Sequence, residues 1–338
     1  MTRKFNLVII LLCSFIISSE FTYKDLPVLQ SGRIKPFDTY ARNHLLQYYG
    51  KSSIKKTEFN DKVKAIDWMF NVFVNPGEEI DRQIFNIRNP EVSFSLGLDK
   101  NDVHRYSFNE IITGFRENQE LLEVLKIKDE ENQSLVDKQI IEIYQNILSF
   151  DQISHSFYCF LPLVSFTNQT NRDFMGLETN EPLSYSYFMR NFDKFRFLLQ
   201  NLIDTDESKW NASHLELSQV AMQLESMTQF QYAQSIKIIP DDSEEWKSPW
   251  ELMDGRKLTE FESRILSLYE KLFYHFTNND IDLANNYATL IIDEINSKKN
   301  INKSLLPLET LYNDIDIFLY SIVFYILSFF LVGISWMI

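Results

Sequence analysis

The chain has 338 residues and a formal net charge of −14, so its surface is acidic. This balance leaves no basic patch suited to a phosphate backbone and argues against nucleic acid as a partner. Its hydrophobic content of 45% includes 28 phenylalanines, which predicts packed cores rather than disorder. The only cysteines are Cys13 and Cys159, and neither CxxC nor CxxCH occurs. The chain is therefore predicted to be neither a c-type cytochrome nor a thioredoxin-like reductant.

The first residues have the pattern of an export signal. Arg3 and Lys4 precede an apolar stretch at 5–17, which has the length of a signal-peptide hydrophobic region and is short for a membrane span. We therefore expect residues 1–19 to form a signal peptide or a signal anchor. Because the basic end of such a segment stays in the cytoplasm, residues 20–314 are expected on the outer, periplasmic side.

The last residues are apolar without interruption. No charged side chain occurs from Ile317 to Ile338, and about 20 apolar residues can span a hydrocarbon core about 30 Å thick. This run predicts a transmembrane helix at 315–338, with Asp314 and Asp316 at its outer end. Since no basic tail follows, we expect either the front end of a longer membrane protein or a separate subunit that partners with a membrane core.

The segment after the leader, residues 20–57, is expected to be extended and polar. Two prolines disfavour helix there and Gly32 permits a turn. A short helix at 40–49 is predicted within it, with Thr39 as its N-cap.

The middle of the chain is predicted to be helical apart from one β element. Apolar residues at three- and four-residue spacing predict a helix at 59–74. β-branched and aromatic residues alternate with polar ones at 84–88 and 92–98, which predicts two short strands near 84–98. Helical periodicity or a capping box marks the segments 107–125, the region after Ser134, 185–202 and 215–236, with a long loop at 162–182.

The clearest helical pair lies at 258–296. A Thr259–Glu262 capping box opens its first apolar stripe, and a second stripe begins at Ile281 after a turn of about four residues. The pair resembles one tetratricopeptide unit, but no second copy follows at a period of about 34 residues. The predicted fold is mainly α: an exported helical domain with a small β element near 84–98, this helical hairpin and a C-terminal transmembrane helix.

Few residues suggest a catalytic or metal-binding site. None of the five histidines pairs with another at helical spacing, which argues against a metal site on one helix. His275 and His44 are candidate haem or metal ligands, but a structural histidine is favoured for both. Cys159 lies in an apolar neighbourhood and is interpreted as a buried thiol. Without a triad, paired carboxylates or a Gly-rich phosphate loop, we predict no enzyme and no catalytic or metal-binding residue in this chain.

The segment LPVLQSGRIKPFDTYAR at 26–42 combines charges of both signs with one glycine and two prolines. It is interpreted either as a turn held by an Arg–Asp pair or as a docking edge for a protein partner or a membrane domain. The candidate docking residues are Gly32, Arg33, Lys35, Pro36, Asp38 and Thr39.

This segment resembles the start of the exported region in cytochrome c biogenesis proteins of the CcsA type, in their extended or ResB/CcsB-fused forms. Those proteins often show a pattern close to LPVQ-x-GGR-x-KP-x-DT. The similarity continues in order along most of the chain, through AIDWM at 65–69, FNIRNPEVSFSLGL at 85–98, YSFNE at 106–110, WKSP at 246–249 and LETLYN at 308–313.

The resemblance implies a membrane-anchored component of System II-like cytochrome c assembly in the cytoplasmic membrane of a bacterium. In that family a membrane core with a tryptophan-rich segment and haem-binding histidines delivers haem to apocytochrome c. No such core occurs here, so no cofactor is expected in this chain itself, which would act as an accessory or positioning domain. The expected partners are the membrane, the haem-handling core and apocytochrome c. The alternative is a general periplasmic scaffold or chaperone, suggested by the helical hairpin.

Overall fold

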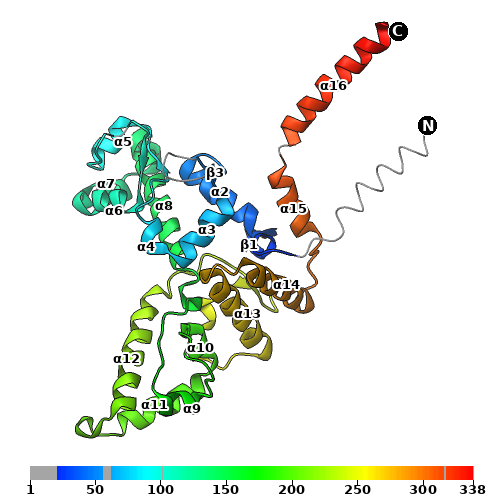
Figure 1. The fold of residues 1–338 in the computed structure, drawn as a ribbon. Coiled ribbons are helices and arrows are strands. Elements are labelled where there is room, and N and C mark those ends of the chain that lie inside the picture. Colours follow the sequence, from blue (N-terminus) through cyan, green and yellow to red (C-terminus); the bar gives the residue numbers. More distant parts are fainter. Residues whose placement is uncertain (1–20, 56–61, 101, 316, 338) are drawn as a thin grey trace.

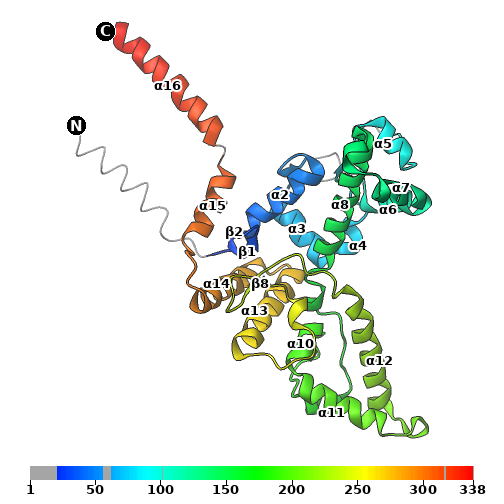
Figure 2. The same ribbon diagram turned by 180° about the vertical axis from the view of Figure 1, so that it is seen from behind.

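The computed structural model describes residues 21–55, 62–100, 102–315 and 317–337 (Figure 1). Most of this part is helical, and its strands form four two-stranded antiparallel sheets. The helices gather into two lobes, and α13 (Glu260–Thr277) and α14 (Ile281–Lys298) lie where the lobes meet (Figures 1 and 2). The expected leader at 1–19 lies outside the described residues.

The first lobe is built from residues 21–155. Its elements are η1 (Tyr23–Asp25), β1 (Pro27–Gln30), β2 (Arg33–Pro36), α2 (Phe37–Tyr49), β3 (Ser53–Ile54), β4 (Val63–Lys64), α3 (Ala65–Val74), α4 (Pro76–Glu79), β5 (Phe85–Asn86), α5 (Pro90–Ser95), β6 (Arg105–Tyr106), α6 (Phe108–Glu117), α7 (Gln119–Ile127), η2 (Glu130–Asn132) and α8 (Leu135–His155). Helix α3 packs on both α2 and α8. The ring of Tyr48 on α2 lies 6.3 Å from Trp68 on α3 and 6.3 Å from Phe150 on α8, so buried aromatic rings join the three helices.

The second lobe follows and is again mostly helical. Its elements are η3 (Tyr158–Phe160), α9 (Gln169–Met175), α10 (Tyr185–Arg190), α11 (Phe192–Ile203), η4 (Glu207–Lys209), α12 (Ala212–Met227) and η5 (Thr228–Phe230), followed by β7 (Ile239–Pro240), β8 (Trp246–Lys247) and η6 (Trp250–Leu252).

Phenylalanines from distant segments join the two lobes. Phe73 of α3 lies 4.6 Å from Phe157, ring centre to ring centre, and Phe157 lies 5.0 Å from Phe273 of α13. Phe37, at the start of α2, lies 5.9 Å from Phe73. All four side chains are buried. The lobes therefore share one core, as the high phenylalanine content predicts.

The predicted helical hairpin is confirmed. Thr259 caps α13 and accepts a hydrogen bond from the backbone of Glu262, whose carboxylate binds back to the Thr259 backbone at 2.9 Å. Helix α14 begins after a short turn and packs along the whole of α13. The fold class is mainly α, as expected.

The predicted strand at 92–98 is wrong. The Asn89 side chain accepts a hydrogen bond from the backbone N–H of Glu91 and so caps a helix. Pro90 occupies the first helical position, so α5 begins at Pro90. Helix α5 ends before Gly97, which has a positive φ of 67°. Only β5 of the predicted β element forms, and it pairs with β6 rather than with the 92–98 segment.

Several helix boundaries also differ from the prediction. The segment 107–125 divides at Asn118 and the segment 185–202 divides at Asn191. In both cases the asparagine amide donates to the carbonyl four residues earlier, at 2.9 Å, and the backbone leaves the helical region. The long loop expected at 162–182 contains α9.

Two further segments are shorter or differently placed than predicted. The segment 215–236 is helical only as far as Met227, followed by the short turn η5. The helix predicted at 59–74 begins at Ala65, after β4, and residues 56–61 of this region lie outside the described part.

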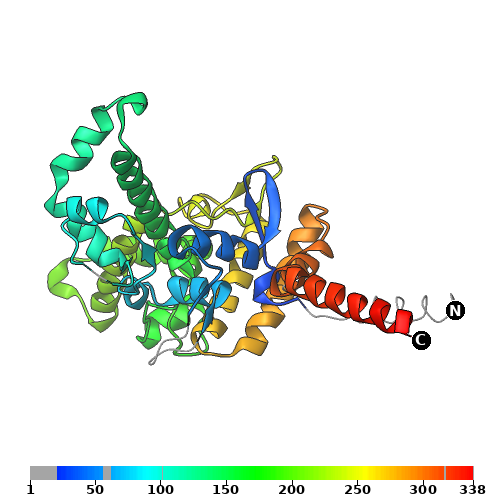
Figure 3. The ribbon, with the colours of Figure 1, turned by 90° about the horizontal axis from the view of Figure 1, so that it is seen from above.

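The last two described helices differ in their contacts. Helix α15 (Leu305–Asp314) packs on β2, α2 and η1, and α16 (Ile317–Met337) extends beyond it, away from both lobes (Figure 3). In the part of the chain that the structure describes, no helix is both long enough and apolar enough to span a membrane.

Candidate functional site

The candidate docking residues at 32–39 lie on the second half of the β1–β2 hairpin and on the first turn of α2, which follows it directly. Strands β1 and β2 pair with Gln30 opposite Arg33, so the loop has two residues. Ser31 and Gly32 have φ angles of 53° and 73°, the left-handed values that two-residue hairpin turns require. Glycine adopts this conformation without strain, which explains its place at the turn.

Helix α2 begins at Phe37, three residues earlier than predicted. Pro36 has an extended conformation at the N-cap position, and Thr39 lies inside the first turn, so the prediction of Thr39 as the N-cap is wrong. Asp38 also lies in this turn, with its side chain only 2% exposed. Its carboxylate suits the positive end of the helix dipole.

Asp38 and Thr39 bind the end of α15. The amide of Asn313 donates to Asp38 Oδ2 at 3.0 Å and to Thr39 Oγ1 at 2.8 Å. Thr39 Oγ1 donates in turn to Glu309 Oε1 at 2.8 Å. These hydrogen bonds join residues that are 270 to 275 positions apart in the sequence.

Basic side chains complete this contact. Arg42 Nε lies 2.7 Å from Asp38 Oδ2, and its Nη2 lies 2.6 Å from Asp314 Oδ1. Lys64 Nζ lies 3.2 Å from Asp314 Oδ2, and Arg33 forms an ion pair with Glu309. Since a carboxylate at the end of α15 is unfavourable next to the helix dipole, Arg42 and Lys64 offset the charge of Asp314. We call this set the α2–α15 junction: Arg33, Asp38, Thr39, Arg42, Lys64, Glu309, Asn313 and Asp314.

The structure brings together only half of the six predicted docking residues. Arg33, Asp38 and Thr39 contact α15. Lys35 instead donates across the hairpin to Gln30 Oε1 at 3.0 Å, and burial, followed by the charge of Arg33, lowers its pKa.

The other two predicted residues support the backbone. Gly32 is at the exposed turn, and Pro36 is buried. The Arg–Asp pair anticipated for this segment is present as Arg42–Asp38.

Sequence reasoning did not identify the α15 side of the junction. Glu309 and Asn313 belong to LETLYN, which is one of the elements that carry the family resemblance, but no role was predicted for either residue. Their spacing of four residues was the available signal, because it places both side chains on one face of a helix.

The hairpin contacts a second distant segment on its other side. The Leu29 N–H donates to the Lys237 carbonyl at 2.9 Å. The turn at Gly32 then faces WKSP across a pocket of about 380 Å³. The pocket is lined by Leu29, Ser31, Gly32, Lys237, Asp241, Ser243, Glu245, Trp246, Lys247 and Glu251.

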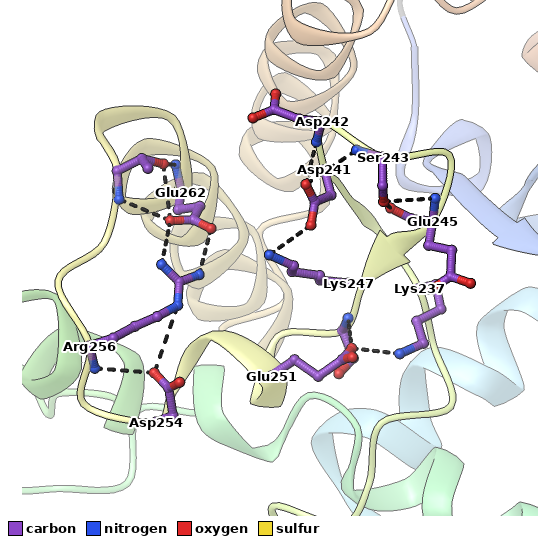
Figure 4. A network of polar contacts seen from close by, with 12 residues as sticks. Lys237, Asp241, Asp242, Ser243, Glu245, Lys247, Glu251, Asp254, Arg256 and Glu262 are labelled. Carbon is purple, nitrogen blue, oxygen red and sulfur yellow. Dashed lines mark hydrogen bonds and ion pairs between the residues drawn. The ribbon is translucent and has the colours of Figure 1, made fainter.

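Opposite charges pair within and around this pocket (Figure 4). Lys247 points to Asp241 at 2.7 Å, and Lys237 to Glu251 at 2.5 Å. Nearby, Arg256 binds Glu262 through two nitrogens. Burial alone would raise the pKa of Glu262, but the bonds from Arg256 and Thr259 outweigh it and lower the pKa to about 2. The pairs Lys247–Asp241 and Lys237–Glu251 therefore give the pocket a fixed polar wall.

His44 lies on α2 behind the junction and is buried. Its Nδ1 lies 3.4 Å from the Tyr48 hydroxyl, and its ring lies 4.4 Å from that of Tyr40. Among the described residues, Nε2 has no hydrogen-bond partner. Burial, with a smaller contribution from the charge of Lys35, lowers the pKa of His44 to about 4, so it is neutral at pH 7.

The other candidate ligands are not assembled into a site. His275 stacks on Tyr287, with ring centres 5.3 Å apart. Cys159 is fully buried, as predicted, and burial raises the pKa of its thiol. Across the described ranges, no three histidine, cysteine or carboxylate side chains lie close enough to hold a metal ion.

Comparison with known proteins does not assign the chain to a family. No family model matches the sequence, and a search of curated proteins finds no significant match.

Proposed function

We propose that this chain is an exported component of cytochrome c assembly that positions apocytochrome c or braces a haem-handling membrane core encoded elsewhere. One observation carries the proposal. Three of the elements that resemble the CcsA-type family, at 26–39, 246–249 and 308–313, are far apart in sequence but meet around one β-hairpin.

The proposal includes a membrane anchor. The uncharged run at 317–338 follows the α2–α15 junction and contains α16, whose described residues do not by themselves meet the length and hydropathy of a membrane span. An inserted α16 would place this junction at the outer surface of the cytoplasmic membrane. There, the junction would fix the orientation of the domain relative to the membrane and to a core within it.

The anchor predicts a definite topology. A phosphatase reporter fused after Asn296 is expected to be active, because the basic start of the chain keeps the leader's front end in the cytoplasm. The full chain is expected to stay in the membrane fraction during alkaline extraction. A matched chain ending at Asp314, fused to a cleavable export signal, should be released. Activity only of a cytoplasmic reporter at Asn296, or release of the full chain, would contradict this topology.

The scaffold alternative depends on the tetratricopeptide-like hairpin. In the structure, the apolar stripes of α13 and α14 are buried, as shown by Ile265, Leu272, Ala288 and Ile291, each at 0% exposure. The apolar face of the hairpin is therefore buried in the core of its own domain. This argues against the apolar stripes of the hairpin as a general peptide-holding surface, and so favours the assembly role.

A further inference from the structure

A second pocket lies away from the junction, between α10, α13, α14 and the loop that precedes α10. Its volume of about 390 Å³ falls within the range of pockets that bind small ligands or peptide side chains. Five of its lining residues carry aromatic rings: Phe160, Tyr187, Tyr274, His275 and Tyr287. Pro162 and Pro182 border it.

Two cationic side chains of the protein already lie close to the faces of these rings. Arg190 lies 5.9 Å from the centre of the Tyr187 ring and binds Glu270 Oε2 at 2.8 Å. Lys271 Nζ lies 5.7 Å from the centre of the Tyr287 ring. Arg190 therefore lies between an aromatic ring and a carboxylate, and Lys271 lies over a second ring.

Glu181 offers the same arrangement to a further cation. It lines the pocket beside Tyr274, and its hydrogen bond is the main reason why the pKa of the Tyr274 hydroxyl is raised. Unlike Glu270, Glu181 forms no ion pair within the described part of the chain. The pocket's own cation, Lys271, lies over Tyr287, so among the described residues no cation pairs with Glu181 or lies over the ring of Tyr274.

We propose that this pocket binds an arginine or lysine side chain of an extended polypeptide, with the cation held by Glu181 and the ring of Tyr274. The pocket is larger than one basic side chain and is bordered by two prolines, so neighbouring peptide residues also fit against it. The net charge of −14 would steer basic segments toward the domain. This proposal does not depend on the role in cytochrome c assembly.

The test uses the full chain purified in detergent and two fluorescein-labelled peptides. One has the sequence Ala-Ala-Pro-Arg-Pro-Ala-Ala, and the other carries citrulline, a neutral isostere, in place of arginine. Fluorescence anisotropy is expected to show at least roughly tenfold tighter binding of the arginine peptide, weakening with added salt. Equal binding of the two peptides, or no binding at about 1 mM protein, would overturn the proposal.

Matched variants locate the site. Glu181→Gln is expected to weaken binding of the arginine peptide roughly tenfold, while Glu178→Gln, which removes the same charge from the same loop outside the pocket, leaves it unchanged. Tyr274→Phe keeps the ring and should retain most of the binding that Tyr274→Ala loses, with melting temperatures confirming that both variants fold. Equal effects of the two glutamate variants would place the binding elsewhere. Competition by free arginine at the concentration of unlabelled peptide would contradict recognition of a polypeptide.

Discussion

Replacing Asp38 by alanine is expected to lower the free energy of unfolding by about 3 kcal/mol, because it breaks a buried charge pair. The Asp38 carboxylate is 2% exposed and accepts from Arg42 and Asn313. Without this carboxylate, the Arg42 guanidinium and the Asn313 amide each lose a hydrogen-bond acceptor. Equilibrium unfolding in urea, followed by tryptophan fluorescence, measures the change.

A second member of the same junction provides the control. Arg33 is 63% exposed, and an exposed ion pair contributes at most about 1 kcal/mol. Arg33→Ala should therefore fold almost as stably as the wild type. If Asp38→Ala and Arg33→Ala destabilise the protein equally, then burial does not determine the strength of the junction, and this description of it is wrong.

The stability of the domain is expected to fall on mild acidification because of His44. The pKa of this side chain is about 4 in the folded protein and about 6.5 in an unfolded chain. Between these values the unfolded state binds more protons, so acid favours unfolding in this window. The stability that depends on a neutral His44 is fully present above about pH 7. Through His44 alone, lowering the pH to 5 decreases the free energy of unfolding by about 2 kcal/mol.

Two variants separate this effect from general acid sensitivity. His44→Gln cannot be protonated, so its free energy of unfolding should change less than that of the wild type between pH 7 and pH 5. His104→Asn serves as the control, because His104 is exposed and has a φ of 52°, which asparagine tolerates. It should keep the wild-type pH dependence. If His44→Gln also keeps it, the buried histidine is not the cause.

Capping boxes in the sequence correctly predicted the starts of α6, α8 and α13. The Thr259–Glu262 box marks the start of α13 because both partners lie within one turn. The breaks at Asn118 and Asn191 were missed, since the apolar spacing continues across them and only the asparagine amides show where the backbone turns. Strands of two residues, such as β6, carry no recognisable pattern, because their partners are set by tertiary packing.

The candidate site shows the limit of sequence reasoning more clearly. The hairpin segment was recognised as unusual, and its Arg–Asp pair was foreseen. Its contact with Asn313 could not be, because 275 positions separate that residue from Asp38 and no local property of either segment encodes the pairing. The family resemblance marked both segments but did not indicate that they touch.

The most direct test of the proposed function is the amount of haem-attached cytochrome c in cells that lack this chain. We expect deletion to lower haem-stained cytochrome c at least roughly tenfold, with apocytochrome c still synthesised, and the wild-type chain to restore it. Asn313→Ala, which removes hydrogen bonds of the junction without removing a charge, should restore less haem-attached cytochrome per molecule of folded chain than the wild type. Wild-type levels of haem-attached cytochrome c in the deletion strain would contradict the proposed role.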